Sequence, residues 1–528
     1  MKSAAKNKTK NIDALADQSQ DALLRLCVSQ QQIIDSLSLQ VKTLTEQIQY
    51  LRQMKFGRSS EALPNALQGE LFDTTPPPTT PQSQPAEPTP GKKRGGRRPL
   101  PRTLETRREV HSIPEEERRC DCGCVKKKIG EDVSEQLDII PATLLRVEHV
   151  REKYACPHCQ NAPVSAPLPP SLLPKTRASN GLLAHILVSK FLYHLPFYRQ
   201  SGYYQSLGFD VSRANLVGWA IRLADAVSPL LERLHAHLMA CHVLQADETG
   251  FTVDRRKEYA WLWRGRHLRE DGSTHYTVVC FHHESTRNME RLNKMLASWQ
   301  GMVFQTDGLP LYRSSKVNAP ALTQGCMAHA RRYFFKCVQA LPKEERAAHP
   351  AAEFLGYFKQ LYAIERRMAS HSASERYRCR REQSRPILEK MRLRMEALLP
   401  VTRPGCGFGA ALQYLRGEWE YLVTYCEFGE LEIDNNRIEN CVRPFAQGRR
   451  NWLHAKSARG AAANCAFYTL LATAKANGVD PAKYLVHVFK ELARLGRNPS
   501  HDQLDALMPW ASSVQEALSQ AGREAGRV

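Results

Sequence analysis

Apolar residues recur at heptad spacing within residues 13–56. Ile34, Val41 and Ile48 are seven residues apart. Each is followed three residues later by a leucine, namely Leu37, Leu44 and Leu51. β-Branched residues at one core position and leucine at the other favour a parallel two-stranded coiled coil, whereas an amphipathic helix packed on its own domain is the alternative. We therefore expect a helix over residues 13–56 and a homodimer or higher assembly through residues 30–56.

The heptad pattern stops at Gly57, where a linker and a basic segment begin and extend through residues 57–102. Residues 72–91 contain seven prolines among Thr, Ser and Gln, which favours an extended, semi-rigid linker. Glycines separate basic pairs in residues 92–102, so the backbone can approach phosphates or a minor groove. A solvated run of charge is the alternative. We expect DNA contacts here from Arg94, Arg97 and Arg98.

Two groups of cysteines bracket an alternating, strand-like segment in residues 103–167. The first group reads CDCGC, and the second reads CPHC, which has the spacing of a zinc knuckle. This arrangement predicts one structural, four-coordinate zinc ion, and it leaves open which two cysteines of the first group bind. The expected ligands are Cys120, Cys122, Cys156 and Cys159, with Cys124 as the alternative and His158 as a further candidate.

Residues 180–240 have apolar positions at helical spacing and predict a helical connector, in which Ser212 can cap a helix. The pattern then changes to short apolar runs. The predicted strands are 241–247, 258–266, 274–283 and 302–307, and the predicted helices are 285–298 and 326–340. The first and fourth strands end in Asp247 and Asp307. A charged helical stretch follows at residues 342–400, and a C-terminal helical region is expected at residues 476–528.

Composition narrows the choice of partner. The 528 residues include 74 Lys and Arg against 54 Asp and Glu, a net charge of +20 that favours nucleic acid. No apolar run approaches the roughly 20 residues that span a bilayer, and the N-terminus lacks the apolar region of a secretory signal. We therefore expect no membrane partner and a cytoplasmic, nucleoid-associated protein. Its 15 cysteines would then be thiols or metal ligands.

The stretch 431–453 combines acids and amides with basic residues: LEIDNNRIENCVRPFAQGRRNWL. Carboxylates suit a hard metal ion and arginines suit phosphates, so the stretch favours a metal-assisted site for nucleic acid. The alternative is an exposed helix with a Glu439–Arg443 ion pair. Trp452 either stacks on a base or fills the core. The expected phosphate contacts are Arg443, Arg449, Arg450 and Lys456.

Three carboxylates that are far apart in the sequence could meet in the fold: Asp247, Asp307 and Glu439. Adjacent parallel strands would bring the two aspartates together, and a later helix would bring the glutamate over them. Convergent carboxylates are what two Mg²⁺ or Mn²⁺ ions need to act on a phosphodiester. The alternative is that the aspartates are solvated or cap the helices that follow them.

An ordered set of motifs extends over nearly the whole chain: LRQMKFGRSSE, GGRRPLPR, CDCGC with CPHC, QADETG, FQTDG, GCMAHARRYF, EIDNNRIENCVRPFAQGRRNWL and TLLATAKANGVDPAKYL. With these motifs the chain resembles the TnpC-type transposases of the insertion-sequence sixty-six family, bacterial DDE transposases with a ribonuclease H-like core. Two positions depart from the family pattern. Met327 stands where Trp is usual, and Asn440 stands where Arg is common.

The resemblance implies an α/β fold with a ribonuclease H-like catalytic core in residues 241–475. This core would have a mixed five-stranded sheet, flanking helices and the insertion at about 342–400, beside a coiled coil and a zinc domain. The resemblance also implies that Asp247, Asp307 and Glu439 form a catalytic triad. The activity would be cleavage at terminal inverted repeats and strand transfer to target DNA, aided by accessory proteins of the same element.

Two other functions fit parts of the sequence. The zipper, basic segment and zinc module alone would fit a DNA-binding regulator without catalysis. A ribonuclease H-like nuclease would hydrolyse DNA without strand transfer. On the helix after the second aspartate, His329, Arg331 and Arg332 could face DNA, although His329 also fits a core position.

Overall fold

A computed structural model describes residues 20–56, 143–154, 164–314 and 321–524. Contacts divide the chain into two units, Met1–Ala62 with Leu231–Ala476 and Leu63–Leu230 with Asn477–Val528. Each is described by itself. The predicted zinc ligands and the basic segment lie outside the described residues, as do the N-terminal residues 13–19 of the predicted helix.

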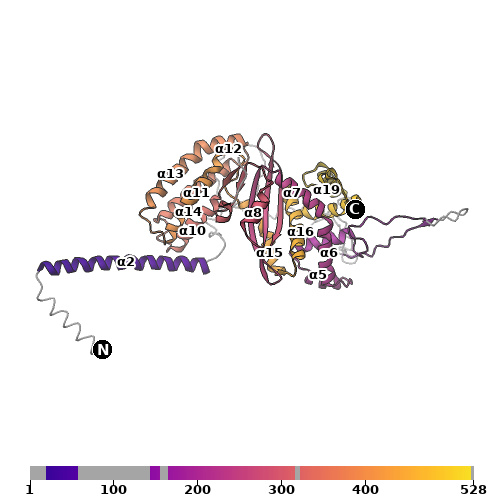
Figure 1. The fold of residues 1–528 in the computed structure, drawn as a ribbon, viewed down its shortest axis with the longest axis horizontal. Coiled ribbons are helices and arrows are strands. Elements are labelled where there is room, and N and C mark those ends of the chain that lie inside the picture. The colour runs from indigo at the N-terminus through magenta and orange to yellow at the C-terminus, as the bar shows by residue number, and fades with distance from the viewer. Residues whose placement is uncertain (1–19, 57–142, 155–163, 315–320, 525–528) are drawn as a thin grey trace, which may run out of the picture. The chain divides into compact units, whose positions relative to one another are not determined.

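The first unit is built on a mixed sheet with the strand order β5-β4-β3-β6-β7 (Figure 1). Strands β3 (Val243–Val253), β4 (Arg256–Leu268) and β5 (Thr274–Glu284) are antiparallel, while β6 (Val303–Gln305) and β7 (Leu322–Gln324) run parallel to β3. A sixth strand, β8 (His454–Ala455), pairs with the far end of β3. This arrangement confirms the ribonuclease H-like fold class. Short strands β7 and β8 are additions to the predicted set.

The first strand is longer than its sequence predicted. It was expected to end at Asp247, but β3 continues to Val253 and turns directly into β4. The turn residues Asp254 and Arg255 both have positive φ, 44° and 64°, which is what a two-residue hairpin turn of type I′ requires. Asp247 therefore lies within a strand rather than at its end. The prediction of a strand-terminal aspartate was wrong here, because pairing with β4 extends β3 beyond its apolar run.

Helix α16 (Ala458–Ala476) covers the sheet at its outer strand, β5. The hydroxyls of Thr469 and Thr473 accept hydrogen bonds from the backbone N–H groups of Phe281 and Val279, at 2.8 and 3.1 Å. An edge strand exposes unpaired backbone groups that invite further pairing. The two threonines satisfy these groups, so β5 is closed by side chains of a helix.

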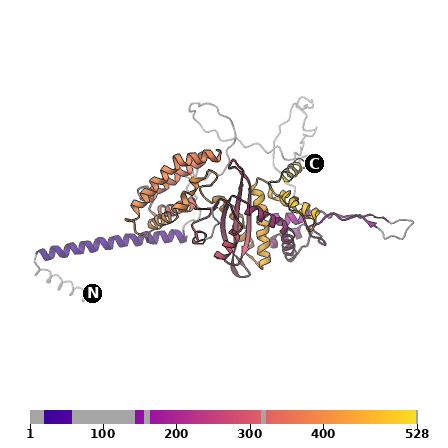
Figure 2. The ribbon, with the colours of Figure 1, turned by 45° about the horizontal axis from the view of Figure 1, so that its top comes forward.

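The insertion consists of helices that gather on the other side of the sheet from α16 (Figures 1 and 2). They are α11 (Pro350–Arg367), α12 (Ala373–Cys379), α13 (Arg385–Leu398) and α14 (Gly407–Val423), with a π-helical turn at Arg380–Ser384. Together with α10 (Met327–Ala340) they enclose a core that includes the stacked rings of Phe334 and Phe354. The predicted helix at 285–298 is the shorter α8 (Met289–Leu296), because Asn288 caps it.

The second unit contains two groups of helices that are distant in the sequence. They are α4 (Asn180–Phe191), α5 (Phe197–Ser206) and α6 (Arg213–Ala226), and then α17 (Pro481–Leu495), α18 (His501–Asp505) and α19 (Ser512–Glu524). Helix α17 packs on α4, and Ser212 caps α6 as predicted. The short strands β1 (Lys153–Tyr154) and β2 (Val164–Ser165) pair with each other. Helix α7 (Ser228–Met239) leads into the first unit.

Helix α2 (Gln20–Phe56) carries the predicted heptads. Its apolar side chains at Ile34, Leu37, Val41, Leu44 and Ile48 are each more than half exposed. Within the described ranges, no helix combines the length and hydrophobicity needed to cross a bilayer. The ten cysteines of the described residues are all free thiols.

Candidate functional site

The parallel pairing of β3 with β6 brings the two predicted aspartates to equivalent positions. Gln245 is the register partner of Gln305, and each glutamine precedes its aspartate by two residues. The shared ladder ends at these glutamines, so Asp247 follows it within β3, and Asp307 lies two residues beyond the end of β6, which is shorter than the predicted strand 302–307. Next to Asp307, Gly308 allows close approach of α14, since a Cβ there would lie 2.5 Å from the hydroxyl of Tyr414.

Asp247 sits among other carboxylates. Burial, followed by the charges of Glu248, Asp307 and Glu439, raises its pKa to about 7, against a hydrogen bond from the Glu248 N–H that lowers it. This N–H donates to Asp247 Oδ1 at 2.8 Å, and the N–H of Leu309 donates to Asp307 Oδ1 at 3.2 Å. The fold therefore collects negative charge at one place without an ion pair to Asp247 or Asp307 in the described part of the chain.

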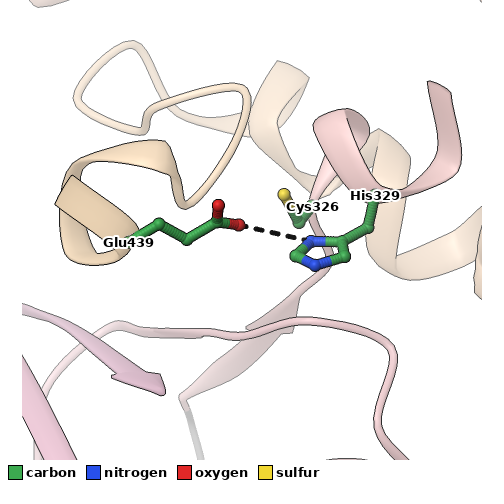
Figure 3. A group of neighbouring side chains, drawn as sticks. All are labelled: Cys326, His329 and Glu439. Atoms are coloured by element: carbon green, nitrogen blue, oxygen red, sulfur yellow. Dashed lines mark ion pairs between the residues drawn. The ribbon is translucent and has the colours of Figure 1, made fainter. Parts of the chain in front are cut away.

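Glu439 enters this group from α15 (Asn436–Trp452), which runs through Pro444 as one helix. Its Oε1 lies 3.7 Å from Nδ1 of His329, and its Oε2 lies 3.7 Å from Nη2 of Arg332. Figure 3 shows the Glu439 carboxylate and the His329 ring facing each other, with Cys326 beside them. His329 thus faces the candidate site and is 23% exposed at its side chain, so it is not a core residue.

The three carboxylates have the chemistry of a site for a hard divalent cation. Asp247, Asp307 and Glu439 carry oxygen atoms, the ligand type that Mg²⁺ prefers, but in the described part of the chain the donor atoms that lie within 4.8 Å of one another are those of Cys326, His329 and Glu439. Oε1 of Glu439 is buried and accepts no hydrogen bond from any described residue. A buried carboxylate oxygen in that state is costly unless a cation or a donor pairs with it.

A second, different polar cluster lies behind the aspartates. Gln245, Gln305 and Gln324 are register partners across β3, β6 and β7, and all three are fully buried. Gln305 and Gln324 donate to the backbone carbonyl of Glu432 at 3.0 and 2.6 Å, and Gln245 donates to Gln305 at 2.5 Å. This row of glutamines anchors the segment that precedes α15 to the parallel strands.

The side chain of Glu432 is held by arginines. Its carboxylate is 3.3 Å from Arg264, 4.0 Å from Arg266 and 3.1 Å from Arg437. Burial alone would raise the pKa of Glu432, but these three charges lower it to about 2. Glu432 is therefore a neutralised structural carboxylate. The sequence signal that could have revealed this cluster is a glutamine after each of two short apolar runs, at Gln245 and Gln305, and a third at Gln324.

Two further contacts fix the start of α15. Buried Arg380 donates to the backbone carbonyls of Tyr425, Phe428 and Leu431 at 3.0, 2.6 and 2.8 Å. Asp434 accepts a hydrogen bond from the hydroxyl of Tyr362 at 2.7 Å and another from the N–H of Asn436 at 3.0 Å. The segment that carries Glu439 into the site is thus fastened by the insertion helices as well as by the sheet.

Glu248 and helix α9 (Pro310–Arg313) were missed by the sequence analysis. Glu248 pairs with Arg287 at 3.1 Å and accepts a hydrogen bond from Tyr312. Arg313 makes an ion pair with Glu418 of α14 at 2.5 Å. These contacts hold the turn after Asp307, and only the three-dimensional neighbours of α9 reveal them.

Comparisons with known proteins identify the family of the chain. The family model described as "Transposase IS66 family" matches residues 175–463, which is more than half of the chain. The chain belongs to the IS66 transposase family. Three further models match, described as a zinc-finger binding domain of transposase IS66 at 117–160, an IS66 C-terminal element at 469–510 and a Transposase C of IS166 homeodomain at 43–110.

Two relatives of this transposase come from Sinorhizobium fredii. One, named uncharacterized protein y4jD, is 29% identical over 500 residues, which are 91% of this chain and 96% of the relative. The other, named uncharacterized protein y4hP, is 30% identical over 435 residues, 79% of this chain and 77% of the relative. The similarity therefore extends over most of the transposase.

The predicted phosphate contacts of the transposase differ in their surroundings. Arg443, Arg450 and Lys456 are exposed. Arg449 instead donates hydrogen bonds to Thr249 and to the carbonyl of Gly250, which ties α15 to β3. Its guanidinium is thus used, at least in part, for structure.

Two other residues that were candidates for nucleic-acid contact fill structural positions. Trp452 packs edge-on against Phe251 and Phe445, with ring centroids 6.1 and 5.6 Å apart, so the core alternative describes it. Arg331 is buried and lies over the ring of Phe335. It does not face solvent as a DNA contact would.

Proposed function

We propose that this IS66-family protein is a DDE transposase that binds the terminal inverted repeats of a bacterial insertion sequence, cleaves DNA strands there and transfers them to target DNA. Asp247, Asp307 and Glu439 would be its catalytic residues. The observation that supports this most directly is the raised pKa of Asp247, which is buried and is also repelled by the charges of Glu248, Asp307 and Glu439. A protein keeps such repulsion where a cation or substrate relieves it.

Two Mg²⁺ or Mn²⁺ ions are the proposed cofactors of this site, held by Asp247, Asp307 and Glu439. When bound, such ions supply the positive charge that activates an attacking oxygen and stabilises a leaving oxygen of a phosphodiester. A structural zinc ion is proposed for Cys120, Cys122, Cys156 and Cys159, with Cys124 as the alternative ligand in the first pair.

The residues of the chain orient the ligands and the DNA. The N–H groups of Glu248 and Leu309 hold the two aspartates by one oxygen each. Hydrolysis of a phosphodiester at the element end would leave a 3′-hydroxyl, and attack of this hydroxyl on target DNA would join the strands. No covalent protein–DNA bond is needed, so no Ser or Tyr nucleophile is assigned.

DNA would be held by exposed basic residues. Arg443, Arg450 and Lys456 follow Glu439 on α15 and just beyond it, where they could contact phosphates near the cleaved bond. Arg449 would contact phosphate only through guanidinium N–H groups that do not already donate to Thr249 and Gly250 of β3. Arg94, Arg97 and Arg98 are proposed contacts to the element ends.

Two copies of the chain would act together. Joining two element ends requires at least two subunits, and the exposed heptad stripe of α2 supplies a surface for a parallel pair through residues 30–56. We also propose that accessory proteins encoded by the same element take part in the reaction and that the protein associates with the nucleoid.

The deciding experiment is a strand-transfer assay with a pre-cleaved element end, a target plasmid and Mg²⁺. Glu439→Gln should bind the end normally and yield no joined product, whereas Glu427→Gln is the matched control, an exposed carboxylate paired with Arg385. Normal joining by Glu439→Gln would refute its assignment. Hydrolysis without joining by the unaltered protein would favour the nuclease alternative, and binding alone would favour the regulator.

A further inference from the structure

The Glu439 carboxylate lies close to two possible metal ligands other than the aspartates, namely Cys326 and His329. Cys326 lies at the N-terminal boundary of α10, His329 follows one turn later on the same helix, and Glu439 approaches from α15. The Sγ of Cys326, a ring nitrogen of His329 and a carboxylate oxygen of Glu439 all lie within 4.8 Å of one another. Figure 3 shows the three groups converging on one space.

These ligand types select a metal different from magnesium. Thiolate and imidazole are ligands of Zn²⁺ and similar borderline ions, whereas Mg²⁺ takes oxygen ligands. Three protein ligands with an open fourth position are typical of catalytic zinc sites. Bond lengths of about 2.0–2.3 Å require ligand atoms roughly 3.3–3.8 Å apart, so small side-chain rotations would close the cluster around an ion.

The shared ligand links this cluster to the candidate catalytic site. The Glu439 oxygen that lies 3.7 Å from His329 is Oε1, the buried oxygen that accepts no hydrogen bond from any described residue. An ion bound between Cys326 and His329 would draw this carboxylate toward α10. Glu439 would then be less available to a cation held by Asp247 and Asp307.

We propose that Cys326, His329 and Glu439 form a second metal site that binds one Zn²⁺-like cation and thereby competes with Mg²⁺ for Glu439. On binding, Cys326 forms a sulfur–metal bond and its thiol proton leaves to solvent. Binding itself does not depend on the proposed catalysis. Only the competition rests on the proposed function, so the two parts fail separately.

Binding is tested by adding Co²⁺ to the full-length protein with its structural zinc left in place. The unaltered chain should take up one Co²⁺ and develop the charge-transfer absorption of a cobalt–thiolate bond. Cys326→Ser should lose this absorption and bind Co²⁺ at least about tenfold more weakly. The serine oxygen can still accept the N–H of Asn435, which Cys326 Sγ accepts at 3.4 Å, so the local fold is retained.

Cys441→Ser is the matched control, because Cys441 is a half-buried thiol of α15 outside the cluster. It should bind Co²⁺ as the unaltered chain does. An equal thiolate absorption in Cys326→Ser, or none in the unaltered chain, would overturn the site.

Competition is tested by the ratio of Mg²⁺-dependent cleavage rates with and without added Zn²⁺. Added Zn²⁺ should lower the cleavage rate of the unaltered chain at least about tenfold and should lower that of Cys326→Ser less. Equal inhibition of both proteins would overturn the competition while leaving the binding result intact. A protein that binds Co²⁺ but never cleaves would instead refute the proposed function.

Discussion

Glu432 and Glu439 are seven residues apart in the same segment, yet they occupy opposite electrostatic environments. Three arginines surround Glu432 and lower its pKa to about 2. Near Glu439, the pKa of Asp247 is raised, by burial first and then by the charges of Glu248, Asp307 and Glu439. The first cluster is balanced and holds the fold together. The second is unbalanced at Asp247 and Asp307, which have no ion pair among the described residues, while Glu439 lies 3.7 Å from His329 and from Arg332.

The balanced cluster gives the largest predicted effect on stability. Glu432→Gln should lower the free energy of unfolding of the sheet-containing unit by about 3–5 kcal/mol, because Arg264 and Arg266 would keep buried charges without their carboxylate. Hydrogen exchange of the β3 and β6 amides measures this loss. Unchanged protection would mean that the arginines find other partners, and the contrast between the two clusters would collapse.

The unbalanced cluster predicts a change of opposite sign. Asp247→Asn should stabilise the metal-free protein at about pH 8, by up to about 4 kcal/mol, because a pKa raised from 3.8 to about 7 marks a destabilised charge. The comparison is made in a chelator by chemical denaturation. A loss of stability in this variant would show that Asp247 is compensated after all.

The same shift predicts a pH dependence. The folded state keeps a proton on Asp247 between pH 3.8 and about 7, where the unfolded chain has lost it. Stability of the metal-free protein from this group is therefore present below this window and falls as the pH rises through it, by up to about 1.4 kcal/mol per pH unit. Asp247→Asn should remove this slope, and unfolding free energies measured across the window check the difference.

A smaller effect is expected where an insertion helix supports the segment before α15. Tyr362→Phe should cost about 1–3 kcal/mol, because largely buried Asp434 would lose the hydroxyl that donates to it at 2.7 Å. Tyr357→Phe is the matched control on the same helix, since its hydroxyl bonds the exposed side of Glu353. Thermal unfolding of both variants separates the two positions, and equal losses would contradict the role of Asp434.

The smallest effect should come from a surface ion pair far from both clusters. Arg394 lies 2.9 Å from Glu353, and both side chains are about two-fifths exposed. Arg394→Ala should change stability by about 0.5 kcal/mol or less, because solvent screens such pairs. A loss of stability as large as that of Glu432→Gln would show that an exposed ion pair contributes as much as a buried one in this protein, which would contradict the role assigned to burial.

Sequence reasoning went furthest where a pattern is long. The three long strands, the heptads of α2 and the cap at Ser212 were predicted from apolar spacing and helix-start chemistry. Strands β7 and β8 escaped because neither contains an apolar run, whereas the equally short β6 lies at the end of the apolar run 302–304. Ordered motifs supplied the family and the choice of the three carboxylates.

What the sequence alone determined is therefore most of the longer elements, the family and the list of candidate ligands. Only the tertiary structure decided that three arginines surround Glu432, while Asp247 and Asp307 have no ion pair among the described residues. Arg264 reaches Glu432 across 168 residues of chain, and no local pattern links positions so far apart. Pairing of β3 with β4 sets Arg264 opposite Gln245, and pairing of β3 with β6 sets Gln245 opposite Gln305, two residues before Asp247 and Asp307.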